Sequence, residues 1–213
     1  MNNKSEKHLN FFKLTEAFHK SGCPVCSRNV EFASGYIENL LYESVNDAVV
    51  RKILRESFGF CKDHAQILLR LGDSLGIAII YNDLLNNFDE ILDKTDYNKF
   101  YQRKTCPVCD LVIEHTVNNV ETMLNYYDDL EFQNEFILSD GLCARHLIEL
   151  LKKCFNKEQR TYFVVFHKKR IAELNKDLSE LIRKNNYVNQ VEQISTDEGK
   201  SWIKVLRYLN GYN

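Results

Sequence analysis

The chain has 213 residues, enough for one large domain or two small ones, and its 44% hydrophobic and 27% charged residues are ordinary for a globular protein. Its net charge of −2 excludes a strong positive field of the kind that attracts nucleic acid. No apolar run approaches the length of a membrane span, and the polar N-terminus lacks the apolar core of a signal sequence. With only two prolines and eight glycines, the composition predicts an all-α protein of long helices. Reduced thiols would fit a cytoplasmic location.

The N-terminal segment, residues 1–22, is expected to form a short helix over about 8–20. The sequence CPVC follows, in which Cys23 and Cys26 flank two residues. A proline at the first intervening position fixes φ and removes one N–H group. This favours a tight turn that lets both thiols face one ion.

Apolar residues at helical spacing then predict two helices of similar length, with a break near residues 43–44. Such a hairpin would return the chain to the CPVC end, where Gly59 allows a sharp bend before Cys61 and His64. Cys61 and His64 are three residues apart on a first helical turn, so their side chains lie on the same face of the helix. The positive end of the helix dipole also favours the thiolate form of the cysteine. The first repeat, residues 23–95, is therefore expected to close its own site with the donors Cys23, Cys26, Cys61 and His64.

One long helix, interrupted near Gly72 and Gly76, is expected to follow His64. A second repeat, residues 106–187, then follows the same plan and offers Cys106, Cys109, Cys143 and His146. The likeness spans about 70 residues of each copy, which indicates an internal duplication. Glu31 aligns with Glu114, and we expect these carboxylates to order the repeat through a salt bridge or hydrogen bond, with support of a metal site or a general-base role as the alternative.

Three thiols and one imidazole per site form a Cys3His donor set, which is typical of structural zinc in tetrahedral coordination. The pattern therefore predicts two zinc ions per chain, with iron–thiolate centres as the minor alternative. A redox dithiol is a rival for a single CxxC, but it does not predict a CxxH about 35 residues later, twice. Disulfides are a second rival. Against them stand the odd number of seven cysteines and the lack of a signal-peptide pattern that would support an oxidising compartment.

The last long helix is predicted over about 157–184, with an apolar stripe on one face. We expect His167, on that stripe, to be a packed histidine and not a ligand, and Cys154 to be a buried small side chain. An exposed connection over about 188–199 precedes a closing helix within residues 196–213. Its apolar face, which includes Trp202, is expected to pack on the bundle.

Charge is uneven along the second half of the chain. Residues 106–151 contain nine acidic side chains and one Lys or Arg, whereas residues 152–184 contain ten basic and four acidic side chains. The first interpretation is that the two segments neutralise each other across a helix interface. The alternative is a basic stripe on residues 152–184 that binds nucleic acid, which the four acids weaken.

The two CPVC segments, the two Gly-x-Cys-x2-His segments and the terminal Ser201-Trp202 helix resemble an uncharacterised family of bacterial cytoplasmic proteins with a repeated CPxC and CxxH signature. The resemblance covers most of the chain and implies metal binding by the eight donors and a cytoplasmic location. It implies no reaction.

No nucleophile–base pair, phosphate-binding loop or HExxH motif is found, so the sequence gives no catalytic residue. The favoured hypothesis is a non-enzymatic, zinc-stabilised helical protein that acts through an unknown protein partner. A metal-dependent enzyme or thiol redox sensor is the first alternative, and nucleic-acid binding through residues 152–184 is the second.

Overall fold

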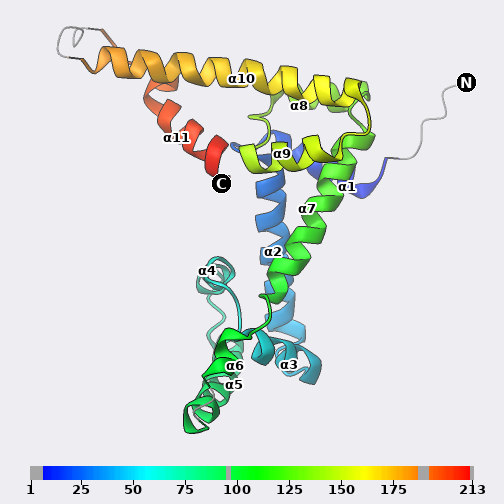
Figure 1. The fold of residues 1–213 in the computed structure, drawn as a ribbon, viewed down its shortest axis with the longest axis vertical. Helices are drawn as coiled ribbons and strands as arrows, with labels where there is room; N and C mark the ends of the chain where they lie inside the picture. Colours follow the sequence, from blue (N-terminus) through cyan, green and yellow to red (C-terminus); the bar gives the residue numbers. More distant parts are fainter. Residues whose placement is uncertain (1–6, 95–96, 187–191, 212–213) are drawn as a thin grey trace, which may run out of the picture. The chain divides into compact units, whose positions relative to one another are not determined.

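The computed structural model describes residues 7–94, 97–186 and 192–211 (Figure 1). Helices are the only regular secondary structure in these ranges, which confirms the predicted all-α fold. In chain order the helices are α1 Leu9–Phe18, α2 Pro24–Glu43, α3 Ala48–Ser57, α4 Lys62–Leu71, α5 Ser74–Asp93, α6 Asn98–Tyr101, α7 Pro107–Asn125, α8 Leu130–Leu138, α9 Ala144–Lys153, α10 Lys157–Lys184 and α11 Thr196–Asn210. No helix in the described ranges is both long and apolar enough to cross a membrane.

The chain divides into two compact units that do not coincide with the two sequence repeats. Unit 1 contains Met1–Arg28 and Thr116–Asn213, and unit 2 contains Asn29–His115. Unit 2 is therefore one continuous segment inserted into the sequence of unit 1. The two long helices α2 and α7 each contribute residues to both units.

The core of unit 1 is rich in aromatic side chains. Phe18 packs edge-to-face against Phe132 and Phe136, at centroid distances of 5.3 and 5.4 Å. Phe163 of α10 joins the same cluster. Edge-to-face rings add stability beyond the burial of their apolar area. This core joins α1, α8 and α10.

The core of unit 2 is mainly aliphatic. Ile37, Leu54 and Ile80 are almost fully buried there, from α2, α3 and α5. Arg51 and Arg55 of α3 both donate to the carboxylate of Asp83 on α5, at 3.0 and 2.8 Å. The ion pairs therefore link the same two helices that the apolar core joins.

The single helix predicted after His64 is wrong, because the structure contains two helices, α4 and α5. Gly72 ends α4 in the left-handed conformation, at φ 70°, which glycine adopts without steric cost. Asp73 then caps α5 by accepting a hydrogen bond from the backbone N–H of Gly76. A C-cap followed at once by an N-cap stops one helix and starts another.

Helix α10 has the bounds that the sequence predicts, but its predicted apolar stripe is only partly buried. His167 on that stripe is buried, whereas Ile171 is 40% exposed. Helix α11 folds back along α10 and packs against it (Figure 1). The Tyr208 hydroxyl oxygen lies 3.1 Å from His167 Nδ1. The Lys184 ammonium group forms an ion pair with the Glu198 carboxylate at 2.8 Å.

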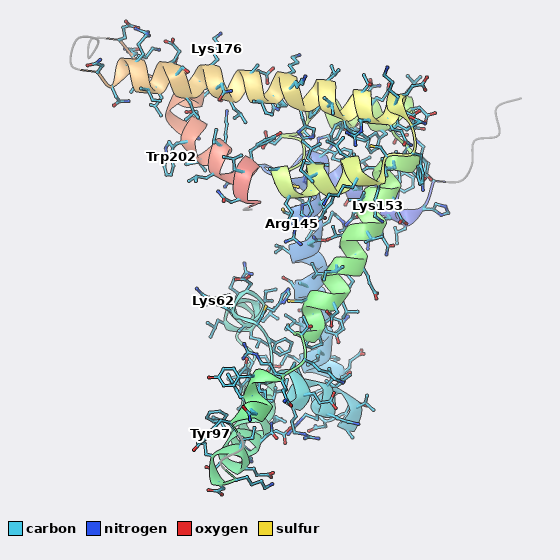
Figure 2. All side chains as sticks on the ribbon, in the orientation of Figure 1. Lys62, Tyr97, Arg145, Lys153, Lys176 and Trp202 are labelled. Atoms are coloured by element: carbon cyan, nitrogen blue, oxygen red, sulfur yellow. The ribbon has the colours of Figure 1, made fainter. Side chains whose placement is uncertain are left out.

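The prediction that the apolar face of α11 packs on the bundle holds only for Val205, which is half-buried. Trp202, Leu206 and Leu209 are each about half exposed. Figure 2 labels Trp202 on α11. The buried residue of this helix is Ser201. The side of α11 that carries Trp202, Leu206 and Leu209 therefore lies outward.

Candidate metal centres

The eight predicted donors form two groups of four, within each of which all donor atoms lie within 4.8 Å of one another. The Cys143 site, in unit 1, consists of Cys23, Cys26, Cys143 and His146. The Cys61 site, in unit 2, consists of Cys61, His64, Cys106 and Cys109. The prediction that each repeat closes its own site is therefore wrong, because each CPVC segment meets the CxxH segment of the other repeat.

Helix lengths explain the crossed pairing. Helix α2 has 20 residues and spans about 30 Å, whereas α3 has ten and returns over about 15 Å. The second repeat has the same imbalance, with 19 residues in α7 and nine in α8. A return helix half as long as the outgoing one cannot bring CxxH back to the CPVC of its own repeat. The sequence prediction assumed helices of similar length.

In the Cys143 site the imidazole is central. His146 Nδ1 lies 3.4 Å from Cys23 Sγ, 3.4 Å from Cys26 Sγ and 3.3 Å from Cys143 Sγ. The sulfurs of Cys26 and Cys143 are 3.8 Å apart. Cys23, Cys143 and His146 are buried.

The Cys61 site has nearly the same spacing. His64 Nδ1 lies 3.2 Å from Cys61 Sγ, 3.5 Å from Cys106 Sγ and 3.5 Å from Cys109 Sγ. The sulfurs of Cys61 and Cys109 are 3.6 Å apart. Only Cys106 is buried here, and the other three donors are half-buried.

These spacings match the edges of a zinc tetrahedron. With zinc–sulfur distances of about 2.3 Å and zinc–nitrogen distances of about 2.05 Å, the edges are about 3.8 Å between sulfurs and about 3.6 Å between sulfur and nitrogen. A disulfide would need its sulfurs about 2.05 Å apart. All seven cysteines are free thiols. The donor sets therefore fit a tetrahedral, thiophilic cation.

The chain forms each half of a site with a local turn. Each CPVC segment starts a long helix, and the Cys106 carbonyl accepts from the N–H of Cys109 at 2.9 Å. Cys61 and Cys143 are the N-caps of α4 and α9, with the histidine three residues later. Gly59 and Gly141 precede them with φ of 83° and 76°, which confirms the predicted bends.

A serine two residues before each of these glycines was missed by the sequence analysis. The Ser57 hydroxyl is buried and lies 2.9 Å from the carbonyl oxygen of Gly59. The Ser139 hydroxyl accepts from the N–H of Gly141 at 3.1 Å and donates to the Phe136 carbonyl at 2.7 Å. The signal was available, because serine stands four residues before the third cysteine in both repeats.

Asp140 is a second residue that the sequence analysis missed. One carboxylate oxygen accepts from the N–H of Gly22, beside the first CPVC turn, at 2.7 Å. The other accepts from Arg170 of α10 at 2.9 Å. Asp140 thus links the two chain segments that supply the Cys143 site. The residue that aligns with Asp140 in the first repeat is Phe58. A comparison of the two repeats therefore could not have identified Asp140.

Two further contacts cover the Cys143 site. His167 is buried, and its Nε2 accepts a 3.4 Å hydrogen bond from the N–H of Leu142, which confirms it as a packed histidine. Gly211, the C-cap of α11, approaches so closely that an added Cβ would lie 3.2 Å from Cys26 Sγ and 3.3 Å from Cys143 Sγ. The end of α11 therefore lies directly on two donors.

The pKa values of several donor groups are shifted from their usual values. A hydrogen bond with Cys23 holds the pKa of Cys143 well below its usual value, and a hydrogen bond with Cys143 raises the pKa of Cys26. Burial lowers the pKa of His146, but hydrogen bonds with Cys143 and Cys23 outweigh it and raise that pKa to about 9. Burial chiefly raises the pKa of Cys109 to about 12. A metal ion binding here would therefore displace protons.

The remaining candidates lie outside the donor groups. Glu31 and Glu114 are exposed, and neither belongs to a cluster of possible ligands. Cys154 is half-buried against the core of unit 1, where its thiol donates to the Leu150 carbonyl at 3.5 Å.

The fold and its sites define a duplicated helical protein with two Cys3His groups that could each hold a metal ion. The chain belongs to a family described as a family of unknown function, DUF6062, whose model matches residues 5–103 and again residues 94–204. The two successive matches support the internal duplication. The chain is also similar to an uncharacterised 23.9 kDa protein in the xynA 3′ region of Caldicellulosiruptor sp. (strain Rt8B.4), at 27% identity over 93% of this chain and 99% of the relative. No solved structure matches the chain.

Proposed function

We propose that this protein binds two structural zinc ions, one in each compact unit, and acts through a protein partner without catalysing a reaction itself. The observation that carries the zinc proposal is the spacing of the donor atoms, 3.2–3.5 Å between sulfur and nitrogen and 3.6–3.8 Å between sulfurs. Four protein donors complete a tetrahedron, whereas catalytic zinc keeps a position for water or substrate. Seven reduced cysteines agree with a cytoplasmic location.

The first test is the metal content of protein purified without a metal-affinity tag. We expect two zinc ions per chain, and cobalt substituted for zinc should give the visible absorption of tetrahedral thiolate coordination. Iron in place of zinc would mean that the sites hold the minor alternative metal. Fewer than one ion of any metal per chain in reducing buffer would contradict the proposal.

A second test separates a structural role from a catalytic or sensing one. Structural zinc supplies roughly 10 kcal/mol or more in small domains, comparable with the roughly 5–15 kcal/mol of net stability of a typical domain. Cys61→Ser should therefore lose one zinc and lower the melting temperature, and Cys143→Ser should do the same at the other site. If metal is lost while the melting temperature of both variants stays unchanged, the sites are not structural, which favours the enzyme or redox-sensor alternative.

An apolar stripe on α11 supports the interaction role. Trp202, Leu206 and Leu209 follow one another at helical spacing and are 53%, 48% and 57% exposed. Replacing Trp202 and Leu206 by lysine should abolish a specific protein association of the wild type while both zinc ions stay bound. An association that survives this double variant would contradict the assignment of the stripe.

The charge pattern gives less support to nucleic-acid binding. Two pairs join the acidic and basic segments, namely Lys153 with Glu121 at 3.1 Å and Arg170 with Asp140 at 2.9 Å. These two pairs support the interpretation that the segments neutralise each other. A nucleic-acid affinity that falls linearly with the logarithm of salt concentration would instead favour the basic stripe.

A further inference from the structure

The Cys61 site borders a cavity of about 320 Å³. Three of its four donors line this cavity, Cys61, Cys106 and Cys109. The aromatic residues Phe58 and Phe60 also line it. A small molecule that enters the cavity would therefore lie beside three of the four donor residues.

The donors of the two sites differ in their exposure. In the Cys143 site, Cys23, Cys143 and His146 are 3%, 1% and 5% exposed, and Gly211 lies against the sulfur of the fourth donor. In the Cys61 site, Cys61, His64 and Cys109 are half-buried. Thiol–disulfide exchange requires direct approach to a sulfur atom, so access favours the Cys61 site.

The two sites also differ in the charge of the residues that line the adjacent cavities. The charged side chains that line the Cys61 cavity are all basic, Lys62, Arg103 and Lys104. Lys104 pairs with Glu56 at 2.7 Å, whereas no described carboxylate forms an ion pair with Lys62, labelled on α4 in Figure 2, or with Arg103. The 370 Å³ cavity beside the Cys143 site is lined by four acidic and four basic side chains. Only the Cys61 cavity therefore favours an anion.

We propose that the Cys61 site is a site of thiol–disulfide exchange that accepts small anionic disulfides and releases its zinc ion when oxidised. This inference rests on the proposed function, because zinc must occupy the site before it can be released. The Cys143 site keeps its zinc under the same conditions.

The chemistry balances within the site. The Cys109 sulfur attacks one sulfur of the disulfide RS–SR, forms a Cys109–SR bond and expels RS⁻, which takes a proton from water. The Cys61 sulfur, 3.6 Å from Cys109 Sγ, then attacks that sulfur and expels the second RS⁻. Two protein thiolates are oxidised to one disulfide, one small disulfide is reduced to two thiols, and zinc loses two of its four donors.

The test uses the full-length, zinc-loaded protein and glutathione disulfide, which is negatively charged at neutral pH. Zinc release is followed with a chromogenic chelator, and disulfides are mapped by mass spectrometry after alkylation. We expect one of two zinc ions to be released, with a Cys61–Cys109 disulfide and with Cys23, Cys26 and Cys143 still reduced. Release of both ions at equal rates, first release from the Cys143 site, or no release overturns the inference. A Cys106–Cys109 disulfide overturns the role of Cys61.

A charge variant tests the selectivity for anions. Lys62→Gln combined with Arg103→Gln should slow zinc release by glutathione disulfide about three- to tenfold, because two nearby charges are removed. Cystamine, a cationic disulfide, should react no more slowly with this variant than with the wild type. Equal slowing with both disulfides overturns the anion preference.

The outcomes also distinguish this inference from the proposed function. Protein that holds two zinc ions and releases neither contradicts only the exchange proposal. Protein that never binds zinc contradicts the proposed function, and disulfide mapping on that protein still reports whether Cys61 and Cys109 react before the other thiols.

Discussion

The Cys143 site and the Cys61 site hold the same four donor types at nearly the same spacing, yet they differ in burial and surrounding charge. Both use the same local elements, a CPVC turn at the start of a long helix and a cysteine that caps a shorter one. What differs is α11, which ends against the Cys143 site at Gly211. The comparison teaches that the repeated motif sets the donor geometry, whereas helices outside the motif set the access to it.

The largest expected effect comes from double variants that distinguish crossed from local pairing. Cys23→Ser with Cys143→Ser removes two donors of one site, so the protein should keep one zinc ion. Cys23→Ser with Cys61→Ser removes one donor from each site, so it should keep none. The number of zinc ions bound per chain in each purified double variant tests this prediction. Local closure predicts the reverse result, zero for the first pair and one for the second.

A smaller effect is expected from acid at His167, in unit 1. Burial, reinforced by the positive charge of Arg170, lowers the pKa of His167 to about 4. The pKa of a histidine in an unfolded chain is about 6.5. Between about pH 6.5 and 4, His167 is therefore protonated in the unfolded chain and neutral in the folded chain. Stability is therefore lost as the pH falls through this window, by about 2 kcal/mol at pH 5.

His167→Gln removes this titration and should lose about 2 kcal/mol less stability than the wild type between pH 7 and pH 5. Denaturant unfolding of both proteins, each with the same chelator present, isolates the histidine from metal loss. The counterpart of His167 in the first repeat is Leu85, which does not titrate and serves as a control as Leu85→Gln. Parallel pH profiles for His167→Gln and the wild type would disprove this account.

Two glycines test how α11 protects the Cys143 site. Gly72 and Gly211 are both helix C-caps, with φ of 70° and 74°, so alanine at either should cost about 1–2 kcal/mol of backbone strain. An added Cβ at Gly72 meets no atom within 4 Å, whereas one at Gly211 meets two donor sulfurs. Gly211→Ala should therefore also weaken zinc binding at the Cys143 site in chelator competition. Equal zinc affinity in both alanine variants would contradict the proposed cover.

The smallest effect is expected at Cys154, the seventh cysteine, which lies outside both donor groups. Cys154→Ser should keep both zinc ions and change the free energy of unfolding by about 1 kcal/mol or less, because the hydroxyl can replace the thiol as donor to the Leu150 carbonyl. Metal analysis and thermal unfolding check this. Loss of one zinc ion would mean that Cys154 supports a site.

The sequence was sufficient to predict the features that depend on neighbouring residues. These include the helical fold, the bends at Gly59 and Gly141, and the bounds of α10. The pairing of the donor segments could not be predicted, because it depends on the unequal lengths of α2 and α3, and the start of α3 is set by the Asp47 cap. The orientation of Trp202 was predicted wrongly because α11 packs through polar residues such as Tyr208.

The insertion of unit 2 into the sequence of unit 1 imposes an order on assembly during translation. All four donors of the Cys61 site lie within residues 61–109, so they are complete while the second half of the chain is still being synthesised. The first two donors of the Cys143 site are made earliest, yet Cys26 must wait for Cys143, 117 residues later. A nascent chain thus carries an unmatched thiol pair, Cys23 and Cys26, through most of its synthesis. The Cys143 site can therefore form only after Cys143 and His146 have been synthesised, later than the Cys61 site.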